Sequence, residues 1–356
     1  MGDKVCIGTA FEVNYTDIGT SFVSHISKPN DNCTFEELIA PHFSDMSEAT
    51  VLFSGGIDSQ FTMGVAQQMG VRVNAITYAG VWENSVVNAS DVLAAQRFCA
   101  KRNIPIRIID LDLKQFLNSG ELIDIATSYK TVSPQVCCHL KFLSSLDNST
   151  PILMGGDPVM LSSWLTHDGN FYARTNATLK GQFTGISAPY YSFADKNNFK
   201  LIKDIFYLSP ELLYYGLVEN IKLLKTQSVY INYKISQGNH APDVENTSDY
   251  MLYKSELYKS FNVPIESTML KNTGFEDLKK HLAAQTGIYN QFDILYRKPI
   301  ETMFQRYSWS KNYNVISVLD KIILRDPLFV DICEQYIDAI KNSKNLKNLL
   351  LYKFDF

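Results

Sequence analysis

The sequence predicts an α/β fold: a doubly wound parallel sheet with a small N-terminal β element and a C-terminal helical lobe. Three observations lead to this prediction. Short apolar runs alternate with amphipathic segments of helix length from residue 50 to residue 156. The first run ends at a pair of glycines, and residues from 209 onward have the pattern of consecutive helices. Strands separated by helices favour parallel pairing, because each helix carries the chain back across the sheet.

Composition, charge and cysteine usage are those of an ordinary globular protein. The chain has 356 residues, of which 46% are hydrophobic and 20% charged, enough for one or two domains. Its net charge of -4 does not indicate the positively charged surface that binds nucleic acid, so nucleic acid is not an expected partner. The six cysteines form no CxxC pair, the first residues do not resemble a secretory signal, and no apolar run is long enough to cross a bilayer. We therefore expect a cytoplasmic protein with reduced thiols and no membrane partner.

Residues 1–47 are expected to form the small N-terminal β element. Within them, residues 4–26 read as two short β runs around a turn-forming segment, Asn14–Gly19. The polar stretch that follows contains one short helical segment at residues 34–39.

Residues 48–200 are expected to form the α/β domain. Four apolar runs predict its strands, at residues 50–53, 71–79, 104–112 and 151–156. Helices are predicted after them, at residues 57–69, 90–103, 120–130 and 134–147, the first because apolar residues recur at every fourth position. Residues 160–200 show no persistent period and are rich in glycine, asparagine, threonine and aromatic residues. We interpret that stretch as a functional loop, since long irregular segments in compact proteins usually carry function.

Residues 201–356 are expected to form a helical lobe that completes the active site. Ser209 and Pro210 predict the start of its first helix, as a cap followed by proline at the first helical position. Further helices are predicted at residues 248–261, 275–285, 291–307 and 315–353.

The glycine pair lies in the string Ser54-Gly55-Gly56-Ile57-Asp58-Ser59, between a strand and a helix. The string has neither the lysine of a Walker phosphate loop nor the spacing of a dinucleotide fingerprint. A glycine turn that opens a helix presents backbone N–H groups and the positive end of the helix dipole to an anion. The Asp58 carboxylate would repel a phosphate unless a divalent cation lay between them, so the string predicts phosphate together with Mg²⁺. The alternative is a plain strand-to-helix turn in which the glycines are only conformational.

This string resembles the pyrophosphate loop of the N-type ATP pyrophosphatases, the PP-loop superfamily, which includes asparagine, NAD and GMP synthetases and tRNA-thiolating enzymes. The resemblance implies an adenine nucleotide α-hydrolase-like fold and cleavage of ATP between its α and β phosphates. It implies that an acyl or carbonyl oxygen attacks the α phosphorus and that a nitrogen or sulfur nucleophile then displaces AMP. Ser54, Gly55, Gly56, Asp58 and Ser59 would hold the leaving pyrophosphate, with ATP and Mg²⁺ as cofactors.

A second glycine string resembles a motif of the synthetase domain in asparagine synthetase and β-lactam synthetase. The strand at residues 151–156 ends in Gly155-Gly156-Asp157, where those families place acids that hold metal-bound pyrophosphate. The family motif continues with a second acid, whereas this chain continues with Pro158. The resemblance implies that Gly155 and Gly156 bind the nucleotide, and that Asp157 is catalytic and shares the metal with Asp58.

The same families carry a lysine near the phosphates, late in the domain. Lys271, in the string Lys271-Asn272-Thr273-Gly274-Phe275, is one candidate catalytic residue by this resemblance, and Lys254 is another. Either lysine would offset phosphate charge in the transition state. The alternative is that both are solvated surface lysines.

The resemblance also implies where the base and the other substrates come from. Adenine would lie beside the second strand, which makes Phe53, Ile76 and Thr77 candidate base contacts, although each is also an ordinary core-strand position. Only 53 residues precede the glycine string, and Gly2 stands where an attached glutaminase would have its nucleophilic cysteine. We therefore expect a small-molecule carboxylate substrate, with nitrogen supplied by an amine, by ammonia or by a separate glutaminase partner.

Two other functions stay open on the same fold. A thiolation or nucleobase-modifying enzyme would use Cys137 and Cys138, but adjacent cysteines cannot readily chelate one ion, so the segment with His139 reads as a buried helix face. A non-catalytic nucleotide-binding protein is the other alternative, because the second motif has one acid instead of two. Arg174, within the irregular stretch, is a candidate for binding a substrate carboxylate.

Overall fold

The computed structural model describes residues 3–16, 19–129, 134–156, 161–165, 171–175, 187–226 and 248–266, together with residues 328, 331, 332 and 335. The predicted helices at residues 275–285 and 291–307 lie outside this part of the chain, as does most of the one predicted at 315–353.

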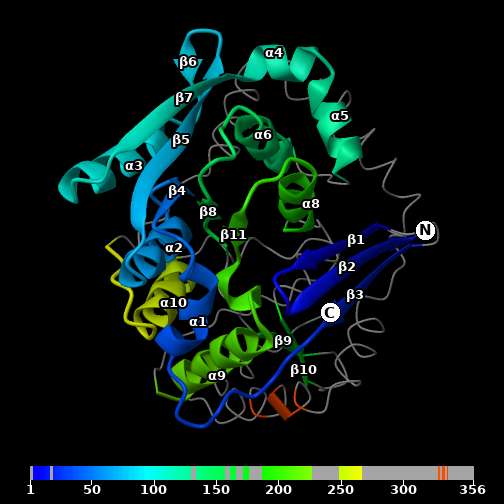
Figure 1. Cartoon of the computed structure of the whole chain (residues 1–356), viewed down its shortest axis with the longest axis vertical. Helices are drawn as coiled ribbons and strands as arrows, with labels where there is room; N and C mark the ends of the chain where they lie inside the picture. The colour runs from blue at the N-terminus through cyan, green and yellow to red at the C-terminus, as the bar shows by residue number, and fades with distance from the viewer. Residues whose placement is uncertain are drawn as a thin grey trace, which may run out of the picture.

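A six-stranded sheet forms the centre of the described structure (Figure 1). Its parallel strands stand in the order β11 (Leu201–Lys203), β8 (Ile152–Met154), β4 (Glu48–Leu52), β5 (Arg72–Trp82) and β7 (Ile106–Asp112). The sixth strand, β6 (Ser85–Val86), folds back antiparallel on the end of β5. Within this sheet, β4 is the first strand along the chain. The chain then runs outward through β5 and β7 and returns to β8, which pairs with the other edge of β4. Such a reversal leaves a crevice outside the carboxyl ends of β4 and β8, where open α/β sheets bind their ligands.

Helices cover both faces of this sheet. Ala49 and Val51 of β4 are buried in one core cluster with side chains of α2 (Ile57–Gln68) and α3 (Ala89–Lys101). Ile152 and Met154 of β8 belong to a second cluster with α6 (Pro134–Leu143) and α8 (Ala188–Lys196). Alternate side chains of a strand point to opposite faces, so the two clusters are the two sides of one doubly wound sheet. The predicted fold class is confirmed.

The first core cluster extends well beyond the sheet. It includes side chains of α1 (Phe35–Phe43), of α9 (Pro210–Thr226) and of α10 (Ser248–Lys259). It also includes β1 (Asp3–Ile7) and β2 (Phe11–Thr16). Segments from both ends of the described chain therefore share one apolar interior, while the division into three domains stays a prediction.

Local sequence explains where the helices begin. Thr34 and Glu37 form a capping box at α1, in which each side chain accepts a hydrogen bond from the other residue's backbone N–H. At α9 the Ser209 hydroxyl accepts from the Leu212 N–H at 3.2 Å, and Pro210 occupies the first helical position as predicted.

The structure corrects three expectations. The N-terminal element is a three-stranded antiparallel sheet of β1, β2 and β3 (Gly19–Ser24), not two runs. The stretch at residues 160–200 is not irregular throughout, since it contains the hairpin β9 (Leu161–Leu165) and β10 (Phe171–Thr175) and then α8. The helix predicted at residues 120–130 is present as α5 (Glu121–Ser128), but an unpredicted short helix, α4 (Leu113–Asn118), precedes it, and a 3₁₀ turn, η1 (Ile205–Tyr207), follows β11.

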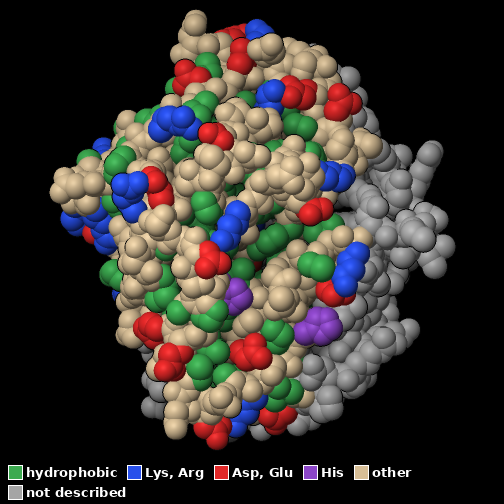
Figure 2. Space-filling model, in the orientation of Figure 1, with side chains coloured by type: hydrophobic (Ala, Val, Ile, Leu, Met, Phe, Trp, Pro, Cys, Tyr) green, Lys and Arg blue, Asp and Glu red, His purple; other side chains and the backbone are tan. Residues whose placement is uncertain are grey.

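Charge and hydropathy are unremarkable over the described surface. Figure 2 shows acidic and basic side chains interspersed over one face of the molecule. Among the described residues, none of the helices combines the length and apolar character needed to span a bilayer.

Candidate active site

The first glycine corner connects the end of β4 to α2. Gly55 has a φ of +74°, and a Cβ there would lie 2.8 Å from the carbonyl carbon of Ala94 in α3, so only glycine fits this turn. Gly56 is the N-cap of α2 and brings no capping side chain. The N–H groups of the first turn therefore have no side-chain cap at the positive end of the helix dipole, an arrangement that favours an anion.

Neighbouring side chains fix the backbone of this corner. The Ser59 hydroxyl donates to the Gly56 carbonyl at 2.8 Å, and the buried Gln60 amide donates to the Gly55 carbonyl at 2.9 Å. The Gln60 side-chain oxygen in turn accepts from the Glu266 N–H at 3.0 Å. The exposed Ser54 hydroxyl lies 3.4 Å from the Gly56 nitrogen. Both carbonyls of the glycine pair are thus engaged, which leaves the corner rigid.

The second glycine corner, at the end of β8, lies directly against the first. A Cβ on Gly155 would lie 2.8 Å from the Ser59 nitrogen and 3.0 Å from the carbonyl carbon of Asp58. The Thr62 hydroxyl of α2 also lies 3.4 Å from the Met154 carbonyl oxygen. The structure therefore brings the two predicted glycine strings together, at the point where the sheet reverses its winding.

Lys254 reaches this corner from α10, 196 residues along the chain from Asp58. Its side chain is 4% exposed, and its Nζ lies 2.7 Å from Oδ1 and 2.8 Å from Oδ2 of Asp58. Tyr258, one helical turn further on, places its hydroxyl 2.5 Å from the same Oδ1 and 3.1 Å from the Gly156 carbonyl oxygen. Since a hydroxyl has one proton, either oxygen can accept it, and the tyrosine links the two corners.

The two corners carry oxygen atoms that suit a hard metal ion. A carboxylate, hydroxyls and a backbone carbonyl are hard oxygen donors of the kind that Mg²⁺ binds, so the residues at the two corners fit this ion. Both oxygens of Asp58 already accept hydrogen bonds, although each has further lone pairs. Over the described ranges, no group of three His, Cys, Asp or Glu side chains could hold a metal. Asp157, the other predicted ligand, lies outside those ranges, as does Lys271, so the metal site stays a prediction.

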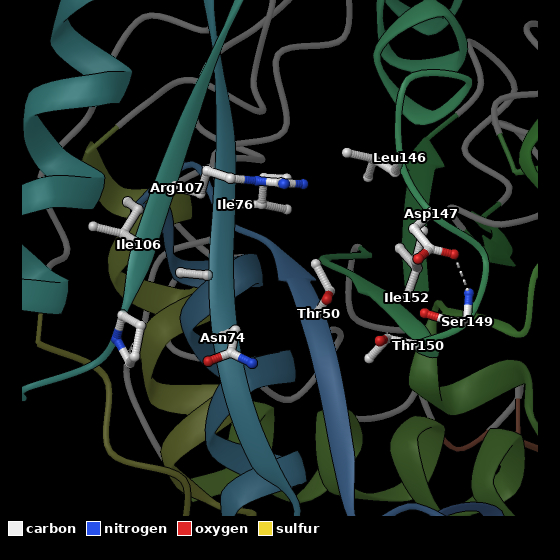
Figure 3. A pocket seen from close by; sticks show the side chains of 12 residues that line it. Thr50, Asn74, Ile76, Ile106, Arg107, Leu146, Asp147, Ser149, Thr150 and Ile152 are labelled. Carbon is white, nitrogen blue, oxygen red and sulfur yellow. Dashed lines mark hydrogen bonds between the residues drawn. The ribbon is translucent and has the colours of Figure 1, made fainter.

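The three predicted base contacts separate onto the two faces of the sheet. Phe53 is 1% exposed and packs on Phe98 of α3, at a centroid distance of 4.9 Å. Thr77 is also buried, on the opposite side of β5 from its neighbour Ile76. Ile76, 2% exposed, is equally buried and lies beside a hollow of about 400 Å³ (Figure 3).

That hollow lies against the amino-terminal halves of the strands, away from the carboxyl ends that carry the glycine corners. Figure 3 shows Arg107 reaching over Ile76 toward a wall that carries Leu146 and Asp147, with Thr50 at the floor. Neither glycine corner lines the hollow. It is therefore a separate feature, and only Ile76 connects it with the predicted nucleotide contacts.

The cysteine pair is buried as the helix-face interpretation predicted. Cys137 and Cys138 are 0% and 2% exposed in α6, and burial raises the pKa of the Cys138 thiol to about 12. Burial also raises the pKa of Cys137, so neither thiol is a thiolate at neutral pH and neither is suited to carry sulfur. His139 hydrogen-bonds through Nδ1 to the Tyr190 hydroxyl at 2.6 Å. The backbone of Arg174 lies in β10, and its side chain is outside what the structure describes.

Several residues at the corners could not be predicted from a motif in the sequence. Gln60 directly follows the glycine string, so its position was the available signal. Tyr258 stands one turn after Lys254 on the same helix face, a spacing that could have suggested it. Lys203 and Asp204, at the end of β11, carry no local signal beyond a pair of charges after an apolar strand.

Comparison with known proteins finds a sequence relative over part of the chain and solved structures of similar fold. No family model matches the chain. Over 83 residues it is 40% identical to 7-cyano-7-deazaguanine synthase of Novosphingobium aromaticivorans, a match that covers 23% of this chain and 34% of that protein. The chain thus spans about a third of the length of the curated relative it matches. This partial likeness is to a protein named as a synthase and is not a likeness to asparagine synthetase.

The structural neighbours are distant. A predicted tRNA methyltransferase subunit from Methanocaldococcus jannaschii is 16% identical, covering 63% of this chain and 91% of that one, with a TM-score of 0.27. A glutamine-dependent NAD⁺ synthetase from Acinetobacter baumannii, solved with ADP, is 12% identical, covering 75% and 52%, with the same TM-score of 0.27. At these scores neither likeness carries a functional argument.

Proposed function

We propose that this protein is an ATP-dependent synthetase that cleaves ATP to AMP and pyrophosphate and forms a carbon–nitrogen bond on a substrate carboxylate. A carboxylate oxygen attacks the α phosphorus, the bond to the β-phosphate oxygen breaks, and pyrophosphate leaves. A nitrogen nucleophile then attacks the activated carbonyl carbon, loses a proton and expels AMP. The observation that carries the proposal is the meeting of two glycine corners and a buried lysine at the reversal point of the sheet.

The corners suit a leaving group that carries several negative charges. The uncapped first turn of α2 offers backbone N–H groups that need no reorganisation when charge develops on the pyrophosphate. Lys254 holds Asp58 in place, and Tyr258 fixes Asp58 relative to Gly156. A bound Mg²⁺ would neutralise phosphate charge that the Asp58 carboxylate otherwise repels.

The relative supports carbon–nitrogen chemistry and suggests a second class of acceptor. Its product, by name, carries a cyano group on a deazapurine ring, and a cyano group is a carbon–nitrogen bond. A substrate that is itself a nucleobase or a related heterocycle is therefore the second candidate, beside a simple carboxylic acid. A sulfur-transfer function has less support, because the adjacent cysteines are buried and their thiols are neutral.

Labelled ATP tests the proposal. The protein is incubated with Mg²⁺, ammonia, ATP labelled at the α phosphorus, and a panel of carboxylic acids that includes heterocyclic ones. We expect labelled AMP in the presence of the correct acid, without glutamine, and about 100-fold less AMP from the variant Asp58→Asn. Asp45→Asn, at an exposed position outside the site, is the matched control and should behave as the wild type. ADP as the only labelled product would refute the proposal, and ATP binding without any AMP would favour the non-catalytic alternative.

A further inference from the structure

A strained aspartate follows β11 at the same edge of the sheet as the glycine corners. Asp204 has a φ of +58° and a ψ of +65°, the left-handed conformation that residues with a side chain adopt only at a cost. The residue is 5% exposed, and its carbonyl accepts the Tyr207 N–H at 2.8 Å. Such strain persists where the surroundings over-determine it, and it concentrates at functional sites.

Both carboxylate oxygens of Asp204 are held by buried partners. The Lys203 ammonium donates to Oδ1 at 2.7 Å, and the Ser187 hydroxyl donates to Oδ2 at 2.5 Å. The same ammonium lies 3.2 Å from the Ser187 oxygen, which closes a triangle of three polar groups. Lys203 is 6% exposed, so the pair is an ion pair in the interior, where loss of one partner leaves the other charge uncompensated.

Asp204 lies directly against the second glycine corner. A Cβ on Gly156 would lie 2.1 Å from Oδ1 of Asp204 and 2.6 Å from its Cα and nitrogen, so the two residues leave no space between them. On its other side, the Gly156 carbonyl faces the Tyr258 hydroxyl that also binds Asp58. Gly156 is thus confined from two directions, by Asp204 and by Tyr258.

We propose that Asp204, locked by Lys203 and Ser187, is a positioning residue that holds the Gly156 backbone in the geometry required for binding metal-bound pyrophosphate. The inference rests on the proposed function, because Gly156 immediately precedes Asp157, the predicted metal ligand. A turn needed only for chain reversal would be met with less strain by glycine. The aspartate supplies in addition an anchored carboxylate that packs on the corner.

The test measures binding of inorganic pyrophosphate, with and without Mg²⁺, by titration calorimetry, together with the melting temperature. Asp204→Gly relieves the strained φ and removes the anchored carboxylate. Asn198→Gly is the matched control, since Asn198 also has a positive φ, of +56°, but lies in the turn between α8 and β11. We expect Asp204→Gly to weaken Mg²⁺-dependent pyrophosphate binding at least about tenfold and to raise the Mg²⁺ concentration for half-saturation. Asn198→Gly should change neither quantity.

If Asp204→Gly does not fold, a less disruptive variant, Ser187→Ala, can be measured in its place. Ser187→Ala removes one hydrogen bond to the carboxylate and should weaken pyrophosphate binding about threefold, with a melting temperature close to that of the wild type. If the folded variants bind Mg²⁺ and pyrophosphate as tightly as the wild type, the positioning role is wrong and the proposed function is untouched. If the wild type itself does not bind pyrophosphate, the proposed function falls and the positioning role falls with it.

Discussion

At the scale of single residues, Lys254 carries the clearest chemical information. A lysine side chain with 4% exposure has given up its hydration, and Asp58 is the described anion that compensates it. The Asp58 side chain is 33% exposed, so the ion pair is buried at the lysine and accessible at the aspartate, which lies at the glycine corner. A pair built only for stability gains little from such geometry, whereas a site that binds charged phosphates needs a fixed carboxylate with an open face.

The first prediction concerns this lysine. Lys254→Met keeps the length and apolar character of the side chain but removes the ammonium, so Asp58 loses the partner that holds it. We expect AMP formation from ATP to fall about 100-fold. The free energy of unfolding should fall by only about 1–2 kcal/mol, because water can reach the exposed side of Asp58.

Lys259→Met is the control for this experiment. Lys259 lies on the same helix and pairs with Glu256 at 2.6 Å, but its side chain is 45% exposed. Its removal should leave the rate of AMP formation within about twofold of the wild type. Equal rates for the two variants would contradict a role for Lys254 in the site.

At the scale of elements, the contact between the end of β8 and the start of α2 depends on glycine. Gly155 faces the backbone of Ser59, and Gly156 faces the backbone of Asp204. Backbone atoms cannot move aside as the end of a flexible side chain can, so each glycine is required by crowding.

The second prediction separates crowding from backbone conformation. Gly156→Ala should reduce the free energy of unfolding by about 2–3 kcal/mol, since the new Cβ must displace Asp204. Gly70 has a φ of +77° with nothing within 4 Å of its Cβ position, so Gly70→Ala tests conformation alone. That control should lose about 1 kcal/mol. Urea unfolding curves of the two variants give the comparison, and a smaller loss for Gly156→Ala would count against the crowding argument.

Elements with a long apolar period could be predicted from the sequence. The fourfold spacing that starts at Ile57 predicted α2, and Ser209 with Pro210 predicted the start of α9. The hairpin of β9 and β10 was missed because strands of five residues are too short to establish a period. One N-terminal strand was missed because the turn at residues 8–10, where Gly8 has a φ of +57°, was not recognised and β1 and β2 were read as one run. The predicted turn segment Asn14–Gly19 does separate β2 from β3, although β2 continues to Thr16.

The site could be predicted where its residues resemble a known motif, which holds for the two glycine strings and for Lys254. The first glycine string was recognisable because its residues are adjacent in sequence and their spacing has a chemical meaning. Tyr258 and Asp204 were not recognisable, because what brings them to the corner is packing between segments far apart in the chain. Tyr258, for example, meets Asp58 across 200 residues.

At the scale of the whole molecule, an aromatic cluster in the core joins the distant segments. Phe61 of α2 stacks on Tyr258 at a centroid distance of 4.1 Å and on Phe206 at 5.7 Å. It also meets Phe261 edge-on at 5.9 Å, and Phe35 of α1 lies 6.3 Å away. The ring of Tyr258 is thus part of the core while its hydroxyl is part of the site, which couples the site to global stability.

The third prediction concerns the pH dependence of global stability. Burial, with the nearby Lys203 ammonium, lowers the pKa of His139 from 6.5 to about 4. Between these values the unfolded chain binds a proton at this position that the folded protein does not bind. The contribution of neutral His139 to the free energy of unfolding is therefore fully present above the pKa of the unfolded chain. The free energy of unfolding should decrease as the pH falls through 6.5 toward 4.

The variant His139→Gln isolates this contribution from those of the acidic residues. Its free energy of unfolding should decrease less than that of the wild type when urea unfolding at about pH 7 is compared with about pH 4.5. His25→Gln, at an exposed position, serves as the control and should follow the wild type. Parallel curves for the wild type and His139→Gln would show that this histidine is not the neutral group described above.

The late position of α10 in the chain has a consequence for biosynthesis. All five parallel strands, the last of them ending at Lys203, are translated before Ser248 is added. A nascent chain can therefore possess the whole sheet and both glycine turns while the helix that supplies Lys254 and Tyr258 has not yet been translated. On this order of events, Asp58 acquires the two partners that hold it only after Tyr258 has been translated, so a shorter nascent chain would present both glycine turns without them.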